Sequence, residues 1–507
     1  MATSKSKDQQ IAELQQTVHD QNSLILILFT IIESNTQTIN ALTAQVNELK
    51  AEVKELKSRL NQNPSNSSKP PSSQGYNKPN PKSEKKKTGK KSGGQPGHKG
   101  ANLQAAVRNM KPTEPPVRLM PSRCKGCAHY DECLHNARVR ETRRVIDGKF
   151  VTTVQDYEAL QVTCMEDQIC YCGEFPEDVK AACQYGENLQ GVIVALNTRA
   201  SVPLHTLTEV ISDLFGIPIS QGTVYAMVQR FAKTISSTID AIKEALVECA
   251  VCHFDGTGVY LNGKLRWVQV ACTELFTWIG LGDGKSAEAM KKLGILDKFQ
   301  GIAVHDCLPA YWLLDQIDSH AVCCAHLLRE LRGIAEKYED QPLWPWAIFM
   351  RGFLNRAYNM VADAKAKGLD CLPDDAIAAL DAEYTRLIRQ GYSNAPPLVD
   401  AEKKKGREKH SDMWNLVNRM ERYQEAVCRF YHDFRVPFTN NQAERDLRMT
   451  KTKRKVAGTF RAEDGLTAYL DIISFIATGI KHGLSVMDSI MAAIHGNPEE
   501  VLVQQGC

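Results

Sequence analysis

Two features of exported and membrane-embedded proteins are missing from this sequence. The first twenty residues contain acidic side chains and no apolar core, which argues against a secretory signal peptide. The apolar run Leu24–Ile32 is far shorter than the roughly 20 residues that a membrane-spanning helix needs. We therefore expect a cytoplasmic protein without membrane contact.

Acidic residues are scarce in one stretch of the chain. Between Lys69 and Lys111 there are eleven Lys or Arg and a single acid, Glu84. The stretch is also rich in Pro, Ser and Gly, so we expect a disordered basic linker over residues 64–115. Such an arm adds salt-sensitive affinity for DNA through counterion release. A solubilising linker without a partner is the alternative, but it needs no such charge bias.

Disulfide bonds are not expected either. The sequence has sixteen cysteines without a secretory signal, a pattern typical of thiols and metal ligands. Residues 116–183 begin with a Cys-x2-Cys pair and predict a small domain with a structural Zn²⁺ bound by four thiolates. The predicted ligands are Cys124, Cys127, Cys133 and Cys164. Alternatives for the fourth ligand are Cys170, Cys172, His129 and His135.

Residues 1–63 contain an unbroken heptad pattern, with alternating steps of three and four residues. Its core positions are Ile11, Leu14, Val18, Gln21, Ile25, Leu28, Ile32, Asn35, Ile39, Leu42, Val46, Leu49, Val53, Leu56 and Leu60. A pattern of this length predicts a coiled coil, which Asn63-Pro64 ends. We expect a homodimer or higher oligomer through this helix. An intramolecular hairpin or a different partner protein are the alternatives.

Within residues 184–245 the sequence predicts a helix-turn-helix. The first helix covers about 205–215, the turn is Gly216-Ile217-Pro218-Ile219, and Ser220 caps a second helix that continues to Arg230. In DNA-binding versions of this motif the second helix enters the major groove. It would present Gln221, Thr223, Tyr225 and Gln229 to the bases. A plain helical hairpin has the same pattern, so the pattern alone does not decide.

Two aspartates stand at or near predicted strand ends. Asp255 lies in an apolar run that breaks at Gly256 and continues to an Asn262-Gly263 turn, the strongest short hairpin signal. A third run, Leu275–Leu281, completes a meander. Residues 301–306 form a further apolar strand with Asp306 at its carboxyl end, where ligands bind in open α/β sheets. A strand-end turn residue is the plainer interpretation of each aspartate.

A third acid, Glu444, lies on the first turns of a predicted helix whose neighbours are mostly basic. The predicted order is meander, helix, strand, helix, strand (321–323), helix, helical insertion and then the Glu444 helix, as in an RNase H-like nucleotidyl-transferase core. Two Mg²⁺ (or Mn²⁺) ions acting on a phosphodiester need a bridging aspartate and one further carboxylate each. We assign Asp255, Asp306 and Glu444 as catalytic metal ligands. A solvated helix is the alternative for Glu444.

Several blocks occur together in this chain and in one known family. They are residues 66–72, 93–100, 216–223, 323–331, 440–445 and 455–461. With these blocks the chain resembles the DDE transposases of the insertion sequence sixty-six type. The resemblance implies a catalytic triad of Asp255, Asp306 and Glu444, a zinc-binding domain, and binding to terminal inverted repeats. Gly256 departs from the family, because many relatives carry a glutamate there, but that neighbour is not a metal ligand.

Basic side chains near the predicted triad are expected to position DNA rather than to perform chemistry. They are Arg329, Arg332, Arg445, Arg448 and Lys451, with a phosphate contact from His326. The preferred partner is therefore double-stranded DNA, both element ends and target.

The sequence thus predicts a multidomain, mainly α protein with an α/β RNase H-like catalytic core, an N-terminal coiled coil, a small zinc-binding module and a helix-turn-helix. The core occupies residues 246–335 and 431–485, with a helical insertion at 336–430 and a C-terminal tail at 486–507. We expect a nucleoid-associated transposase of the bacterial cytoplasm that catalyses metal-dependent 3′-end cleavage and strand transfer, with accessory proteins of the same element as candidate partners. A structure-specific nuclease and a non-catalytic DNA-binding repressor are the rivals.

Overall fold

The computed structural model describes residues 7–62, 66–67, 111–113, 115–146, 150–166, 168–339, 345–395 and 410–503. Its contacts divide the chain into two compact units. The first comprises Met1–Asn77, Val179–Glu209 and Ile219–Cys507, and the second comprises Lys78–Asp178 and Val210–Pro218. Of the predicted basic linker 64–115, only residues 66–67, 111–113 and 115 are described.

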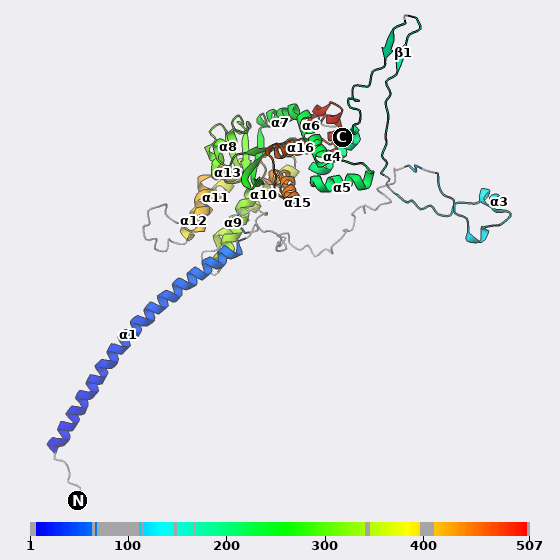
Figure 1. Cartoon of the computed structure of the whole chain (residues 1–507). Coiled ribbons are helices and arrows are strands. Elements are labelled where there is room, and N and C mark those ends of the chain that lie inside the picture. The colour runs from blue at the N-terminus through cyan, green and yellow to red at the C-terminus, as the bar shows by residue number, and fades with distance from the viewer. Residues whose placement is uncertain are drawn as a thin grey trace. The chain divides into compact units, whose positions relative to one another are not determined.

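A five-stranded mixed sheet lies at the centre of the first unit, with strand order β5-β4-β3-β6-β7 (Figure 1). Its strands are β3 (Val251–Leu261), β4 (Lys264–Cys272), β5 (Thr277–Gly282), β6 (Ile302–His305) and β7 (Ser319–Val322). The first three form the predicted antiparallel meander, whereas β6 pairs parallel with both β3 and β7. Asn262 and Gly263 have φ angles of 46° and 75°, as a two-residue hairpin turn requires.

Helices surround this sheet, and the first unit is mainly helical. The helices before and within the sheet region are α4 (Glu187–Thr198), α5 (Leu204–Phe215), α6 (Gln221–Thr234), α7 (Ser236–Val247), α8 (Ala287–Lys291) and α9 (Cys324–Lys337). Between β6 and β7 the chain forms a 3₁₀ turn, η3 (Pro309–Leu313), where we expected a helix. The segment starts at a proline and spans only five residues, too few to establish regular α-helical hydrogen bonding.

The predicted insertion is helical throughout its described part. Its helices are α10 (Pro345–Ala366), α11 (Asp374–Asn394), α12 (Asp412–Arg422) and α13 (Gln424–His432). They share a core in which the Trp346 indole donates a 2.7 Å hydrogen bond to the Leu387 carbonyl. Trp344 and the basic run 403–405 lie outside the described residues.

Four helices complete the first unit: α14 (Asn441–Asp446), α15 (Arg448–Ala457), α16 (Glu463–Lys481) and α17 (Val486–Ile494), followed by η4 (Pro498–Leu502). Helix α16 packs on β5 and on α6. The segment that we expected to be a C-terminal tail contains α17 and η4, and its Ile490 and Val501 side chains are fully buried in the core between these helices and the sheet. The end of the described chain is thus part of the folded core.

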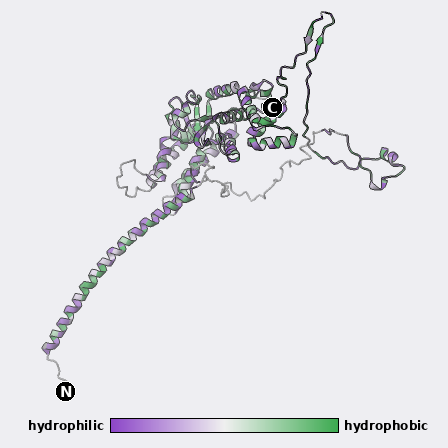
Figure 2. Cartoon of the chain, in the orientation of Figure 1, coloured by the Kyte–Doolittle hydropathy of each residue, from purple (hydrophilic) through white to green (hydrophobic). Residues whose placement is uncertain are grey.

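The N-terminal helix α1 (Lys7–Asn61) is a single helix of 55 residues whose described side chains are almost all exposed. Apolar and polar residues alternate along it, as Figure 2 shows. The predicted heptad positions are exposed, for example Ile39 at 62% and Leu49 at 58%. By length and composition, one segment of α1 (Gln9–Lys57, mean hydropathy 1.2) and the bent pair α16–α17 are the candidate membrane spans among the described residues.

The second unit contains little regular structure in its described part. A short 3₁₀ turn η2 (Ser122–Cys124) and helix α3 (Tyr130–His135) precede a two-stranded antiparallel ribbon of β1 (Gln161–Thr163) and β2 (Cys170–Cys172). All of these elements are solvent-exposed or half-buried. The fold of this unit therefore does not depend on a large apolar core.

Candidate active site

Asp255 and Asp306 meet at the point where strands β3 and β6 part. The parallel register pairs His253 with Val304, so two positions further along the strands Asp255 stands opposite Asp306. Strand β6 ends at His305, and the Asp306 carboxylate accepts a 3.1 Å hydrogen bond from the Leu308 amide as the chain turns away. Asp306 therefore follows the carboxyl end of β6, as predicted, where ligands bind in such sheets. Asp255 lies within β3, which continues to Leu261 because the strand stays paired with β4, so the expected strand end at Gly256 was wrong.

Glu444 is brought to the same face of the sheet by α14. Asp255 pairs with Val270 of β4, and neighbouring residues on paired strands share a face. Val270 belongs to the same buried apolar cluster as Ala443 and Leu447 of the Glu444 segment, and Glu444 is close enough to contribute to the raised pKa of Asp255. The three acids predicted from three distant segments therefore face one region of the first unit.

The electrostatics of Asp255 report the same proximity. Burial and the nearby charge of Asp306 raise the pKa of Asp255 to about 7, with a smaller contribution from Glu444. The Lys451 ammonium and a 2.8 Å hydrogen bond from the Gly256 amide oppose the shift. Negative charge accumulates at this site, and a bound cation would relieve it.

Two basic side chains of α9 hold Glu444. The Arg329 guanidinium lies 3.3 Å and the His326 Nε2 atom 3.7 Å from the same Glu444 oxygen. Burial and Arg329 lower the pKa of His326, while Glu444 opposes that shift. Among the described residues, His326 Nδ1 is buried without a hydrogen-bond partner. Both residues were predicted as DNA contacts, and here they orient a carboxylate.

Asn440, which the sequence analysis gave no role, fixes the start of the Glu444 helix. Its side-chain amide donates a 2.7 Å hydrogen bond to the Phe254 carbonyl, and its amide oxygen lies 2.7 Å from His253 Nδ1. Its backbone amide donates to the Cys323 sulfur at 3.0 Å. Asn440 thus ties α14 to the two residues before Asp255. Asn440 is the first residue of the block 440–445, and its place in that block was the only indication in the sequence analysis that it has a role.

The other end of α14 is also anchored. The Lys481 ammonium lies 2.8 Å from the Asp446 carboxylate, and both side chains are largely buried. Thr277 of β5 donates a 2.8 Å hydrogen bond to the same carboxylate oxygen. A helix of six residues is too short to be stable alone. Glu444 is therefore positioned by tertiary contacts on both sides.

Comparison with known families shows which family the chain belongs to. The model described as "Transposase IS66 family" matches residues 182–468, more than half of the chain and all of the site. This chain belongs to the IS66 transposase family. The model of a family of unknown function, DUF6444, matches residues 5–104. No curated protein matches the chain at a significant level.

Family membership makes this chain a DNA-processing enzyme, and several predicted DNA contacts of the transposase surround the acids. Lys451 is close enough to lower the pKa of Asp255. Arg445 and Arg448 are exposed on either side of Leu447. Arg332 instead pairs with Glu336, 2.9 Å away, one turn further along α9.

The predicted recognition helix forms as α6, with the Ser220 hydroxyl accepting the Thr223 amide at 3.1 Å. Its side chains differ in their surroundings. Gln221 is exposed, whereas Gln229 donates a 3.3 Å hydrogen bond to the Asp464 carbonyl. Burial and a hydrogen bond with Asp464 raise the pKa of Tyr225 to about 12. Tyr225 and Gln229 therefore contact α16 within the protein.

Among the described residues of the transposase, no group of three or more His, Cys, Asp or Glu side chains is arranged so that it could hold a metal ion. The predicted zinc ligands Cys124, Cys127, Cys133 and Cys164 are accordingly not gathered, and the zinc site stays a prediction. In the candidate active site, Glu444 pairs with Arg329, which leaves Asp255 within β3 and Asp306 after β6 as the two carboxylates without an ion-pair partner among the described residues.

Proposed function

We propose that this IS66-family protein is a DDE-type transposase with an RNase H-like core, which binds the terminal inverted repeats of its element and catalyses metal-dependent 3′-end cleavage and strand transfer. The observation that supports this most is the convergence of Asp255, Asp306 and Glu444 on one face of the sheet. The strand order, a meander extended by two parallel strands, agrees with such a core.

The carboxylate oxygens of the three acids are the kind of ligand that Mg²⁺ or Mn²⁺ prefers. Mg²⁺ takes one or two protein carboxylates and keeps several waters. Asp255 of β3 and Asp306 after β6 can supply these carboxylates. Glu444 would complete the set. When bound, the metal supplies positive charge at the attacking and leaving oxygens of the phosphodiester. Crowding of negative charge around Asp255 supports this assignment.

The chain's own side chains would orient the reactants. Arg329 and His326 orient Glu444. With Glu444 serving as a metal ligand, the same two side chains would be available to contact a DNA phosphate. Water would attack the phosphodiester at the element end and free a 3′-hydroxyl. That hydroxyl would then attack target DNA in the same site, so no covalent enzyme intermediate is required.

DNA would contact the basic helix α15 and the exposed face of α6. Helix α15 presents exposed Arg448, Arg454 and Lys455 close to the acids, which suits sequence-independent phosphate contacts. On α6, Gln221 and Arg230 are exposed. Tyr225 and Gln229 contact Asp464 within the protein. We therefore expect Gln221 and Arg230 to contribute more to recognition of the element ends than Tyr225 and Gln229 do.

We further propose that two copies associate through α1. The side chains at the two alternating core positions differ in shape, mostly β-branched at one and mostly leucine at the other. The first position holds Ile11, Val18, Ile25, Ile32, Ile39, Val46, Val53 and Leu60, and the second holds Leu14, Gln21, Leu28, Asn35, Leu42, Leu49 and Leu56. This distribution favours two parallel strands. In that arrangement Glu52 would face Lys57 of the second copy, an opposite-charge pair.

The decisive experiment is strand transfer on labelled DNA that carries the element's ends, with Mg²⁺. We expect joined products from the intact protein, and a loss of about 100-fold or more in Glu444→Gln, which keeps the side chain's shape but loses its charge. Glu499→Gln is the matched control, because Glu499 is exposed and far along the chain in η4. Equal activity of Glu444→Gln and the control would overturn the assignment. Cleavage without joining would favour a structure-specific nuclease, and end binding without any product would favour a repressor.

A further inference from the structure

The block that begins at Asn66 contacts helix α9 in the described structure, although the proposed chemistry gives it no task. The Asn66 side-chain amide donates a 2.8 Å hydrogen bond to Glu336 Oε2. The other oxygen of the same carboxylate accepts a 2.9 Å hydrogen bond from Arg332 Nε. Glu336 is therefore shared between its own helix and the segment that follows α1. Hydrogen bonds to a charged group are among the stronger ones in proteins.

Gly333 makes room for this contact. A Cβ atom at position 333 would overlap the Asn66 carbonyl oxygen, a backbone atom that cannot turn aside as a flexible side chain would. Glycine inside a helix weakens it relative to alanine. Helix α9 thus contains a destabilising residue at the point where the Asn66 backbone lies against it.

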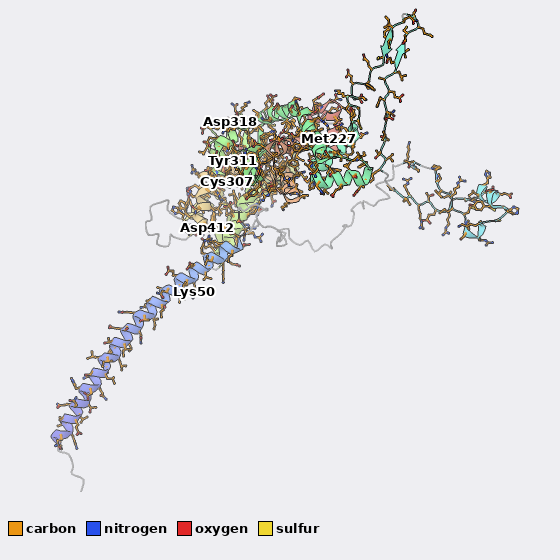
Figure 3. All side chains as sticks on the ribbon, in the orientation of Figure 1. Lys50, Met227, Cys307, Tyr311, Asp318 and Asp412 are labelled. Atoms are coloured by element: carbon orange, nitrogen blue, oxygen red, sulfur yellow. The ribbon has the colours of Figure 1, made fainter. Side chains whose placement is uncertain are left out.

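A second contact joins the end of α1 to the same helix. The Lys337 ammonium lies 2.7 Å from Glu55 of α1 and 2.8 Å from Asp412 at the start of α12. Burial would lower the pKa of Lys337, but the hydrogen bonds to Asp412 and Glu55 outweigh it and raise that pKa. Asp412 lies beside the C-terminal part of α1, as Figure 3 shows.

We propose that Asn66 forms an anchor that docks the C-terminal end of α1 on α9 of the same chain, through Gly333 and Glu336, with Lys337 holding Glu55 of α1. The other end of α9 supplies His326 and Arg329, which hold Glu444. The anchor would therefore fix the direction of the association helix relative to the helix beside the active site. This consequence rests on the proposed roles of α1 and Glu444, but the docking itself does not.

Hydrogen exchange on the full-length protein tests the docking without any transposition readout. In the intact protein we expect the backbone amides of Asn66 and Ser67 to be protected. Gly333→Ala should speed their exchange about tenfold or more, since it excludes the Asn66 carbonyl, while α9 itself stays protected or gains protection. Gly352→Ala is the matched control, because a Cβ there meets only the end of the Arg356 side chain, at 3.5 Å, within helix α10. It should leave the exchange of Asn66 and Ser67 unchanged.

A second variant guards against damage to α9. Asn66→Asp lies outside the core and places a carboxylate against Glu336, so it should speed the exchange of the amides at positions 66 and 67 as Gly333→Ala does. Rapid exchange of these amides already in the intact protein would overturn the proposal. Unchanged exchange in Asn66→Asp would do so as well, whatever Gly333→Ala does to the helix. Either result would leave the strand-transfer proposal untouched, since that is measured separately.

Discussion

Asn440 uses both ends of its side-chain amide on strand β3, next to a proposed metal ligand. Asn440→Ala would leave His253 Nδ1 and the Phe254 carbonyl buried without their partner. We expect a loss of about 1–3 kcal/mol in the free energy of unfolding, together with lower strand-transfer activity because α14 loses its anchor beside Asp255. Urea unfolding and the strand-transfer assay measure the two effects. Asn441→Ala, at the exposed neighbouring asparagine, should change neither; equal behaviour of the two variants would contradict this role.

Lys453 gives the stability a distinct pH dependence. Its side chain is 6% exposed, its ammonium donates a 2.6 Å hydrogen bond to the Asn197 carbonyl, and burial lowers its pKa from 10.5 to about 8. Below pH 8 both the folded and the unfolded chain carry this proton, so the folded state bears the full cost of the buried charge. Between about pH 8 and 10.5 the folded chain releases the proton first, and stability should rise by up to about 3 kcal/mol.

The measurement is the difference in unfolding free energy between the intact protein and Lys453→Met, followed from pH 7 to pH 10.5. Methionine fills a similar volume without a charge, so the difference isolates this one group from the tyrosines that titrate nearby. The unfolding free energy of the intact protein should increase relative to that of the variant as the pH rises. A flat difference would mean that Lys453 keeps its ordinary pKa.

At the residue scale, the acids could be predicted from sequence, whereas their supports could not. Asp255 and Asp306 stand at ends of apolar runs, a local signal that survives without any structure. Asn440 forms hydrogen bonds with residues 186 and 187 positions earlier in the sequence, and Lys481 pairs with Asp446, which is 35 positions earlier. Such contacts depend on how helices pack on the sheet, which spacing along the chain does not encode.

At the scale of elements, α14 depends on the buried pair of Lys481 and Asp446. Lys481→Met would leave the Asp446 carboxylate buried without a counter-charge, at a cost of about 3 kcal/mol or more in unfolding free energy. The double variant Asp446→Asn with Lys481→Met removes both charges and should recover part of that loss. Urea unfolding of the double variant and of the single variants Lys481→Met and Asp446→Asn checks this. A double variant as unstable as the sum of two single variants would show that the pair is not coupled.

The elements themselves were predictable where local signals were strong. The hairpin at Asn262-Gly263 and the Ser220 helix cap follow from turn and capping chemistry, and both form as expected. Boundaries shifted where tertiary packing decides: β5 begins at Thr277 rather than Leu275, and the Pro309 segment is a 3₁₀ turn. Residues 486–494 are rich in apolar side chains, but their role was missed because these side chains become buried only by packing against α4 and α16, which lie far away in the sequence or across a turn.

For the whole molecule, the exposed apolar positions of α1 predict a complex of two chains. Transposition joins two DNA ends, so an association helix outside the catalytic unit suits the proposed task. Replacing a core leucine by lysine would put like charges from both chains at a site that is otherwise buried inside the coiled coil. We therefore expect Leu28→Lys with Leu42→Lys to dissociate the complex while leaving α1 exposed and the catalytic unit folded.

Sedimentation equilibrium of the full-length protein measures this directly. The intact protein should have about twice the 56.5 kDa mass of one chain, and the double variant should have the mass of one chain. Gln37→Lys with Ala44→Lys is the matched control, because it adds the same charge to the outer face of the helix, away from the heptad core. It should keep the mass of the complex. A single-chain mass for the intact protein, or the same mass for both double variants, would contradict association through the heptad positions.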